Sequence, residues 1–304
     1  MRSSYEEKIQ AEVLDDIRIG EQGYKYRLLD GLPVSPFITP GKYHLSRTLQ
    51  TRPSDVCYVS FPRSGSTWLS YILLLIVRQG ILPKNQTLRD NIYWVTSSWP
   101  RSYNRDQLDA FSLPRIFKNH MPYHMALGGK PVDGPCKYIY LARNPKAVMV
   151  SYYYFERGKP WTGYYSGSWE HWFKMFVTGQ LQRGDWFNHV LSWWEHRDTD
   201  NILFLKYEEL KRVFDLNVKQ IADFLGYPLS SELLDKIREK TSFQNMKKDP
   251  FSNLHESREF NNAFWRGKVD SWKLQFTVAQ NEQFDALYAE RMRDSGLTFD
   301  MDAG

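Results

Sequence analysis

Short apolar runs that alternate with helical segments constrain the fold of this chain most strongly. Four runs rich in β-branched and aromatic residues cover residues 56–60, 115–119, 137–142 and 202–206. They do not alternate cleanly between apolar and polar residues, which is typical of parallel strands buried on both faces. Helical periodicity follows three of them, over residues 67–79, 145–155 and 208–225. The pattern predicts an α/β fold with a central parallel sheet, helices on both of its faces and right-handed crossovers.

The remaining segments are expected to join this sheet in one domain, residues 1–304, because α/β domains often reach this size. An N-terminal arm with loops is expected over about residues 1–50. An aromatic-rich insertion, about residues 156–200, is expected to carry helices near 168–177 and 185–196. After these come a helix near residues 231–240, a long polar loop over 241–271 and a last helix over 278–293.

Composition and charge exclude several classes of protein. The chain is 42% hydrophobic and 25% charged, which is ordinary for a globular protein and excludes collagen and a disordered chain. Lys and Arg number 40 and Asp and Glu 35, and this excess of +5 is spread along the chain. Nucleic-acid binding is therefore not required, whereas a site for a small anion and simple solubility both remain open.

The sequence gives no sign of export or membrane insertion. Its start contains acidic residues and lacks the apolar stretch of a secretory signal. The longest apolar run, residues 68–77, is half of the about 20 residues that a membrane span needs, so it predicts a buried helix. Cys57 and Cys136 each open a β-branched or aromatic stretch and are expected to be buried, reduced thiols. We therefore expect a cytoplasmic protein.

The turn after the first strand, residues 61–67 (FPRSGST), joins a strand to a helix through small residues. Its backbone N–H groups and hydroxyls are expected to lie at the positive end of that helix, where an anion binds well. A nucleotide-triphosphatase loop would read GxxxxGK[ST], but Ser60 and Ser66 replace the first glycine and the lysine. Arg143 also stands where such an enzyme would offer a magnesium carboxylate. The turn therefore predicts an anion site of another kind.

Polar side chains follow the ends of the other predicted strands, where parallel sheets bind their ligands. They are His120, Arg143 and Tyr207. Lys118 and His120 lie two residues apart in an extended run, so both side chains are expected on one face. The unperturbed pKa of histidine, about 6.5, lies near neutral pH, so His120 is a candidate general base, and Lys118 can neutralise developing negative charge. The spacing of Arg143 and Ser151 allows a guanidinium and a hydroxyl to converge on one phosphate.

Together these motifs resemble the cytosolic sulfotransferase family over nearly the whole chain. Its members move a sulfonate from 3′-phosphoadenosine 5′-phosphosulfate (PAPS) to an alcohol, phenol or amine, and release adenosine 3′,5′-bisphosphate (PAP). The resemblance implies that the turn binds the 5′-phosphosulfate and that Trp68 stacks on the adenine. The turn residues concerned are Arg63, Ser64, Gly65, Ser66 and Thr67.

The same resemblance assigns further nucleotide contacts. Arg143 and Ser151 correspond to residues that hold the 3′-phosphate, and Tyr207 to a tyrosine beside the adenine. A nucleotide-binding segment, about residues 241–272, contains Thr241, Phe243, Arg266 and Gly267 as the corresponding contacts. Its motif usually reads RKG, so the lysine is missing here or shifted to Lys268.

The family resemblance also implies the chemistry, an in-line transfer that uses no metal. His120 corresponds to the general base, while Lys118 and Arg63 stabilise the sulfonate and the leaving phosphate. Ser151 is expected to restrain Lys118 until the acceptor binds. Arg63 departs from the cytosolic pattern, which usually has lysine at this position.

The aromatic-rich insertion resembles the acceptor-side lid of the family. Trp172 and Phe173 are expected in the core, because adjacent aromatic residues on a helix usually anchor it. The acceptor itself is not identified by the sequence. The candidate acceptor-binding residues are Tyr43, Trp94, Trp99, His124 and Tyr164.

Residues 273–282 resemble the KxxxTVxxxE dimerisation segment of the family. The matching residues are Lys273, Thr277, Val278 and Glu282. They predict a small homodimer interface, and Thr277 is equally placed to cap the last helix.

Two other functions remain open. A carbohydrate sulfotransferase is one, because RSGS is common in that branch of the superfamily, although the expected lack of a membrane anchor opposes it. A nucleotide-binding module without turnover is the other, and the presence of Lys118 and His120 opposes that.

Overall fold

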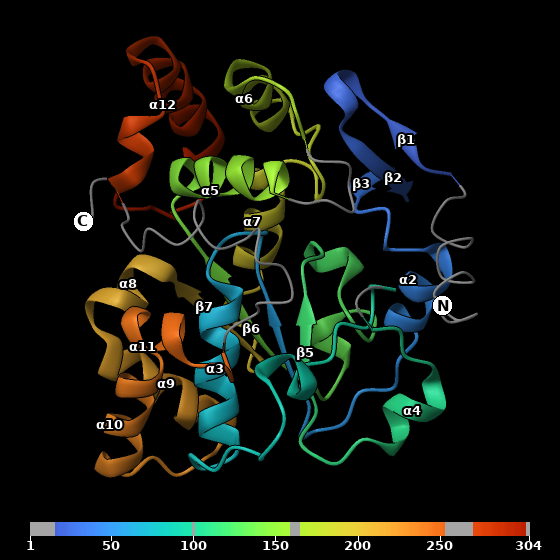
Figure 1. Cartoon of the computed structure of the whole chain (residues 1–304), viewed down its shortest axis with the longest axis vertical. Coiled ribbons are helices and arrows are strands. Elements are labelled where there is room, and N and C mark those ends of the chain that lie inside the picture. Colours follow the sequence, from blue (N-terminus) through green and yellow to red (C-terminus); the bar gives the residue numbers. More distant parts are fainter. Residues whose placement is uncertain (1–15, 99–100, 159–164, 253–269, 302–304) are drawn as a thin grey trace.

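This computed structural model describes residues 16–98, 101–158, 165–252 and 270–301. A four-stranded sheet lies at its centre, with strand order β5-β4-β6-β7 (Figure 1). All neighbouring strands in it are parallel. The strands are β4 (Val56–Val59), β5 (Ile116–Asn119), β6 (Lys137–Ala142) and β7 (Ile202–Lys206). The four predicted strands are therefore confirmed to within one residue at each end.

The register brings the carboxyl ends of the strands to one edge of the sheet. Val59 pairs with Asn119 on one side and Tyr140 on the other, and Ala142 pairs with Lys206. The residues singled out in the sequence directly follow these ends, so the fold places them at a common edge.

Alternate strand residues enter two different cores, as the period of two in a strand requires. On one face, Val59 and Tyr140 pack against the layer of α5, α6, α7 and α12. On the other, Tyr58 and Leu141 pack against α3, α8, α9 and α10. The first layer comprises α5 (Pro145–Arg157), α6 (Trp169–Val177), α7 (Trp186–Trp194) and α12 (Val278–Met292). The second comprises α3 (Ser66–Val77), α8 (Tyr207–Arg212), α9 (Phe214–Leu225) and α10 (Ser231–Lys240), and the predicted α/β class is confirmed.

Local sequence explains where these helices begin. Ser168, Asp185 and Thr277 stand just before α6, α7 and α12, and each side chain accepts a hydrogen bond from a backbone N–H of the first turn. Helix α3 is apolar on every side and is buried from Leu69 to Val77, as predicted for residues 68–77. Within the described ranges, no helix has the length and apolar character that crossing a bilayer requires.

Two predictions about the second layer were wrong. The helix expected over residues 208–225 is broken at Val213, whose φ of −124° and ψ of 57° are not helical. The side-chain amide of Asn217 donates to the carbonyl oxygens of Glu209 and Val213, so carbonyls near the break stay paired. The expected loop after residue 240 contains a short helix, α11 (Phe243–Lys248), which Ser242 caps.

The N-terminal arm forms a small antiparallel sheet that the sequence reading missed. It consists of β1 (Arg18–Ile19), β2 (Lys25–Leu29) and β3 (Leu32–Val34). Asp30 and Gly31 connect the last two strands with φ of 48° and 80°. Asp-Gly is a strong signal for such a hairpin turn, so this pair was the overlooked sequence signal.

Short helices connect the main elements. Helices α2 (Pro40–Arg47) and α4 (Arg105–Ala110) lie to the right of β5 in the view of Figure 1. The described ranges contain the 3-10 helices η1 (Glu21–Gly23), η2 (Leu88–Asn91), η3 (Tyr123–Met125), η4 (Pro131–Asp133) and η7 (Asp270–Leu274).

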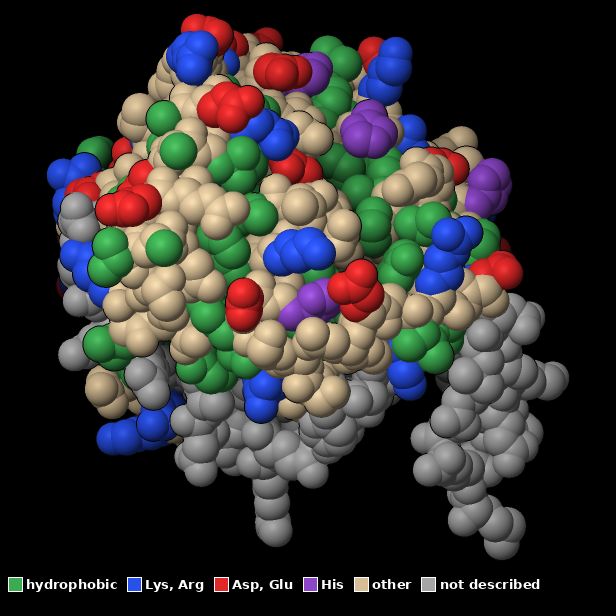
Figure 2. All heavy atoms as spheres, turned by 90° about the horizontal axis from the view of Figure 1, so that it is seen from above, with side chains coloured by type: hydrophobic (Ala, Val, Ile, Leu, Met, Phe, Trp, Pro, Cys, Tyr) green, Lys and Arg blue, Asp and Glu red, His purple; other side chains and the backbone are tan. Residues whose placement is uncertain are grey.

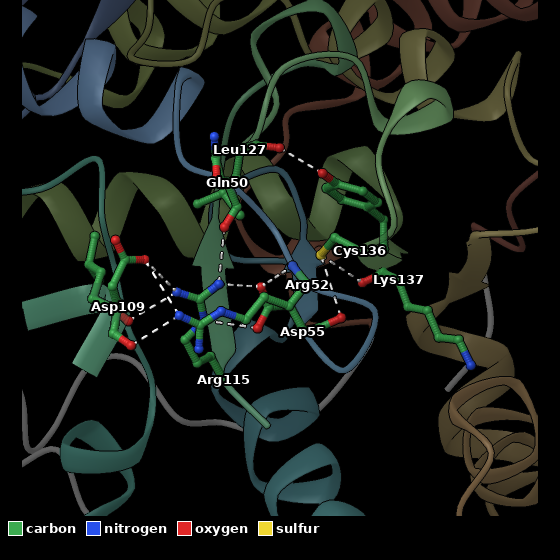
Figure 3. Close-up of polar contacts among 10 residues, drawn as sticks. Gln50, Arg52, Asp55, Asp109, Arg115, Leu127, Cys136 and Lys137 are labelled. Atoms are coloured by element: carbon green, nitrogen blue, oxygen red, sulfur yellow. Dashed lines mark hydrogen bonds and ion pairs between the residues drawn. The ribbon is translucent and has the colours of Figure 1, made fainter. Parts of the chain in front are cut away.

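The amino ends of β4 and β5 are joined by a fully buried ion pair (Figure 3). Arg115 donates from Nε and Nη2 to the two carboxylate oxygens of Asp55, at 2.9 and 2.6 Å. Arg115 also donates to the carbonyl oxygens of Gln50 and Leu108, and the backbone N–H of Arg52 donates to Asp55. The pair is therefore surrounded by the hydrogen bonds that a buried charge needs.

Two further predictions about the core agree with the structure. Cys57 and Cys136 are free thiols and both are buried. Trp172 and Phe173 are buried as well, and the indole N–H of Trp172 donates to the carbonyl oxygen of Met149.

Candidate active site

The turn between β4 and α3 has an unusual backbone that only certain residues tolerate. Arg63 and Gly65 have φ of 72° and 101°, and Gly65 is the N-cap of α3. A Cβ atom on Gly65 would lie 2.7 Å from Cδ2 of Tyr207, the residue that follows β7. Glycine is therefore required at this position both by its conformation and by the close approach of Tyr207.

Two buried donors in this region fit an anion. The hydroxyl of Ser64 is fully buried, and no described residue accepts or donates a hydrogen bond to it. The buried Nε of Arg143 also lacks a hydrogen-bond partner among the described residues. Unsatisfied buried polar groups are rare. Ser64 lies just before the N-terminus of the twelve-residue helix α3, and Arg143 donates from Nη1 to the carbonyl oxygen of Arg63 in the same turn. The turn can thus hold the negatively charged groups of a nucleotide.

Arg63 lies between the other two predicted phosphate-binding residues. Its Nε donates to the hydroxyl of Ser151 on α5 at 3.1 Å. Nη1 of Arg143, which follows β6, donates to the carbonyl oxygen of Arg63 at 2.9 Å. Burial and the neighbouring charge of Arg143 lower the pKa of Arg63 to about 10. The structure thus brings together Arg63, Arg143 and Ser151, while the expected restraint of Lys118 by Ser151 remains a prediction.

Aromatic side chains stand beside the turn. Trp68 meets Tyr207 edge to face with ring centroids 5.3 Å apart, and it stacks on Phe214 at 5.9 Å. The guanidinium of Arg143 lies 4.6 Å from the centroid of the Tyr207 ring. Such surfaces suit a flat heterocycle next to a phosphate.

The other predicted nucleotide contacts follow helix α10 in the chain, and some of them lie outside the described residues. Thr241 is buried and its hydroxyl donates to the carbonyl oxygen of Ile237 at the end of α10. Phe243 is partly buried and begins α11. Three further predicted residues, Arg266, Gly267 and Lys268, lie outside the described residues.

His120 is held in one tautomer by the chain around it. Its Nδ1 lies 2.7 Å from the carbonyl oxygen of Ser60. A carbonyl oxygen only accepts hydrogen bonds, so Nδ1 carries the proton and Nε2 keeps its lone pair. His120 is thus arranged as a proton acceptor at Nε2.

The surroundings of His120 favour its neutral form. Burial is the main cause that lowers its pKa well below 6.5, and the charges of Lys118 and Arg183 act in the same direction. The ammonium of Lys118 lies 4.8 Å from the centroid of the Trp94 ring, and that ring meets His120 edge to face at 5.9 Å. Trp94 therefore contacts both predicted catalytic residues.

A second histidine, His189, is hydrogen-bonded to the backbone of His120, and the sequence did not predict this role. Nε2 of His189 on α7 lies 3.1 Å from the carbonyl oxygen of His120, to which it donates. The hydroxyl of Tyr140 lies 2.9 Å from Nδ1 of the same ring and donates a hydrogen bond to it. Burial lowers the pKa of His189 to about 3, so the ring is neutral and can make both bonds.

The predicted acceptor residues fall into different environments. Tyr43 packs against the apolar cluster of Leu29, Val34, Ile38, Met121 and Met125, here called the acceptor-side cluster, and its hydroxyl donates to Asp30. His124 is exposed on η3, and Trp99 and Tyr164 lie outside the described residues. In the part of the chain that is described, no three His, Cys, Asp or Glu side chains are grouped to hold a metal ion.

Comparison with known proteins gives a consistent result. The sequence profile of the sulfotransferase domain matches residues 53–296. The chain is 34% identical to rat (Rattus norvegicus) sulfotransferase 1C2, covering 91% of this chain and 96% of that protein. It is 36% identical to human sulfotransferase 1E1, with coverage of 82% and 87%.

Solved structures agree with these relatives. The crystal structure of mouse sulfotransferase SULT7A1 complexed with PAP superimposes with a TM-score of 0.74 at 30% identity, covering 89% of this chain and 95% of that one. A retinol dehydratase, at 22% identity and a TM-score of 0.75, shares the fold. The chain therefore belongs to the sulfotransferase family, as its resemblance to the cytosolic members predicts.

Proposed function

We propose that this site transfers a sulfonate from PAPS to a hydroxyl or amine of a small molecule, with His120 as the general base. The observation that carries the proposal is the tautomer of His120, whose unprotonated Nε2 is kept neutral beside cationic groups. PAPS supplies a sulfonate that is already activated by an acidic leaving group. A metal ion is not needed on this account, because fixed cations can stabilise the developing charge.

Each residue of the turn region has a role in the proposal. The hydroxyl of Ser64 and the N-terminus of α3 bind the 5′ end of the nucleotide, together with Gly65, Ser66 and Thr67. Arg143 and Ser151 bind the 3′-phosphate, and Trp68 and Tyr207 contact the adenine. His120 takes the proton of the acceptor, while Lys118 and Arg63 stabilise the charge on the transferring group and the leaving phosphate. The PAP bound to mouse SULT7A1 supports a nucleotide site of this kind here.

Calorimetry can test the nucleotide site independently of the acceptor. We expect tight binding of PAP and much weaker binding of adenosine 5′-monophosphate, because Arg143 and Ser151 would lose their phosphate. A charged hydrogen bond contributes about 1.5–3 kcal/mol, so a difference of at least tenfold is expected. Equal affinities would contradict the proposal.

An activity screen can test the transfer itself. The protein would be mixed with radiolabelled PAPS and pooled phenols, sterols, amines and sugars, with and without a chelator of divalent metals. We expect label on at least one acceptor pool and no dependence on the chelator. Binding of PAP without transfer to any pool would favour the nucleotide-binding module. Transfer only to sugars would favour the carbohydrate sulfotransferase, which the family comparison does not favour.

The proposal includes a weak homodimer through the segment at the start of α12. Leu274 and Val278 are 81% and 77% exposed, and Lys273, Thr277 and Glu282 are exposed beside them. The hydroxyl of Thr277 also caps α12 by accepting from the N–H of Gln280. Sedimentation of Val278→Glu should show fewer dimers than the wild type. An unchanged profile would mean that this segment only begins helix α12 and does not form a dimer.

A cytoplasmic protein of one domain, without nucleic acid as a partner, is part of the same proposal. On the face at the top of Figure 1, basic and acidic side chains are interspersed with hydrophobic ones (Figure 2). The positive excess of the chain is therefore not gathered into a single patch on this face, which supports a small-molecule partner.

A further inference from the structure

Arg183 is a buried cation whose guanidinium is left largely unsatisfied by the described residues. It is 4% exposed, and its Nε and Nη1 atoms have no hydrogen-bond partner among the described residues. It also forms no ion pair with any carboxylate in the described part of the chain. A buried guanidinium in this state is costly, since it has lost its water without gaining a partner.

The fold nevertheless fixes Arg183 in place. Its φ of 80° is left-handed, which is uncommon for a residue other than glycine. Its N–H donates to the carbonyl oxygen of Pro33 at 2.7 Å. The preceding residue, Gln182, is held at its N–H by the hydroxyl of Tyr24 and at its carbonyl oxygen by that of Tyr152. A strained backbone that several contacts maintain is characteristic of functional sites.

Arg183 lies on the acceptor side of the proposed active site. Its backbone partner Pro33 belongs to β3, and the neighbouring Leu32 and Val34 are part of or pack against the acceptor-side cluster. That cluster contains Met121, which directly follows His120 in the chain. Arg183 is also close enough to His120 for its charge to act on the imidazole.

The positive charges around Arg183 outnumber the carboxylates that act on it. Lys118 and Arg63 are assigned to the transferring sulfonate and its leaving group, so they do not require a further anion. The carboxylate that acts on Arg183 is Glu156 on α5, and it acts on Arg63 as well. One carboxylate thus acts on both the buried Arg183 and the partly buried Arg63.

We infer that Arg183 binds an anionic group of the acceptor, so that the preferred acceptors are small hydroxylated acids. This inference rests on the proposed function and adds the substrate class. A carboxylate suits the site because its two oxygens match the fork of a guanidinium. The acid group would also align the acceptor hydroxyl with Nε2 of His120 by fixing the other end of the molecule.

Matched pairs of acceptors test the inference on the unaltered protein. Sulfonation of hydroxyphenyl carboxylic acids, such as 3-(4-hydroxyphenyl)propionate, would be compared with that of their primary amides. We expect kcat/KM to be at least about tenfold higher for the acid in the preferred pair, as one charged hydrogen bond provides. PAP binding with no preference for the acid in any pair would overturn the inference alone. Loss of both PAP binding and transfer would overturn the proposed function with it.

Two variants show whether Arg183 is the cause of the preference. Arg183→Met should raise KM for the acid about tenfold or more and leave KM for the amide and the affinity for PAP nearly unchanged. Arg183→Lys keeps the charge and should retain a preference for the acid. If Arg183→Met still prefers the acid, or if Arg183→Lys loses the preference entirely while binding PAP normally, the assignment to Arg183 is wrong. If Arg183→Met fails to fold, the comparison of acid and amide acceptors on the wild-type protein still tests the inference.

Discussion

The arginines at the two edges of the central sheet differ in whether the chain itself pairs them. At the amino edge, Arg115 is paired with Asp55 through two hydrogen bonds and donates to two carbonyl oxygens as well. At the carboxyl edge and on the acceptor side, Arg63, Arg143 and Arg183 form no ion pair within the described residues. A cation that the chain itself satisfies supports the fold, whereas one that it leaves unsatisfied is available to a ligand.

This contrast separates stability from function in residues of one chemical type. Removing a partner at the amino edge should lower the free energy of unfolding and leave the chemistry of the folded protein unchanged. Removing a group at the carboxyl edge should reduce binding or catalysis and leave stability nearly unchanged. The five predictions below test this separation.

The largest effect is expected for His120→Ala. A general base contributes about 10²–10⁴ to the rate, so kcat should fall by that factor, while the affinity for PAP should stay nearly intact. The matched control is His44→Ala, since His44 is exposed on α2 and should leave both quantities unchanged. Turnover of His120→Ala within threefold of the wild type at saturating acceptor would remove this residue from the mechanism.

The next effect concerns the amino edge. Asp55→Ala leaves Arg115 buried without its carboxylate and should lower the free energy of unfolding by about 3–5 kcal/mol. Asp109→Ala is the control, because Asp109 is 46% exposed and lies 3.6 Å from Arg115, so its loss should cost less than about 1 kcal/mol. Urea unfolding measures both values. Equal losses for the two variants would show that burial does not set the strength of this pair.

A smaller effect is expected for the 3′-phosphate. Arg143→Met should weaken binding of PAP by about 10- to 150-fold, which corresponds to one charged hydrogen bond. Binding of adenosine 5′-monophosphate should change little, because it lacks the group that Arg143 is proposed to hold. Calorimetry with both nucleotides measures the difference. An equal loss for both would assign Arg143 to the turn and not to the 3′-phosphate.

We expect kcat/KM to fall only slightly as the pH is lowered toward 5.5. With an ordinary pKa of about 6.5, His120 would be protonated at pH 5.5 and kcat/KM would fall about tenfold. Burial, Lys118 and Arg183 lower this pKa, so the neutral base persists to lower pH and the loss should be smaller. The profile of kcat/KM between pH 8 and 5.5 tests this directly. A midpoint at or above 6.5 would contradict the depressed pKa.

The sequence predicted one side of the site better than the other. On the nucleotide side, short strands and the residues just after them define the positions, so Arg63, Arg143 and His120 were found from local patterns. The acceptor side depends on contacts between distant segments. Arg183 and Pro33 are 150 residues apart in the numbering, and no local pattern indicates that they meet.

The same distinction explains the errors in secondary structure. Strands and helices with long, regular patterns were predicted to within a few residues. The break at Val213 was not, because it depends on an amide of Asn217 that pairs with the carbonyls near it. His189 was missed because its role comes from its position behind His120 and not from any motif.

Arg63 tests how far the contrast between the two edges extends, because it is partly satisfied by the chain. Its Nε is bound to Ser151 and its guanidinium lies 4.4 Å from the centroid of the Phe155 ring. These contacts occupy one part of the fork, and we expect the rest to bind the nucleotide. We expect Arg63 to bind a nonbridging sulfonate oxygen and a phosphate oxygen, and Lys118 to act near the leaving oxygen.

The smallest effect is therefore expected for Arg63→Lys. A lysine keeps the charge but loses the bond from Nε to Ser151, so kcat should fall about tenfold or less, roughly 1.4 kcal/mol of transition-state stabilisation. Lys118→Ala removes a charge outright and should be far more damaging. Both values of kcat would be measured at saturating PAPS and acceptor. If Arg63→Lys is as damaging as Lys118→Ala, the planar fork is essential, and Arg63 acts in the transition state and not mainly in binding.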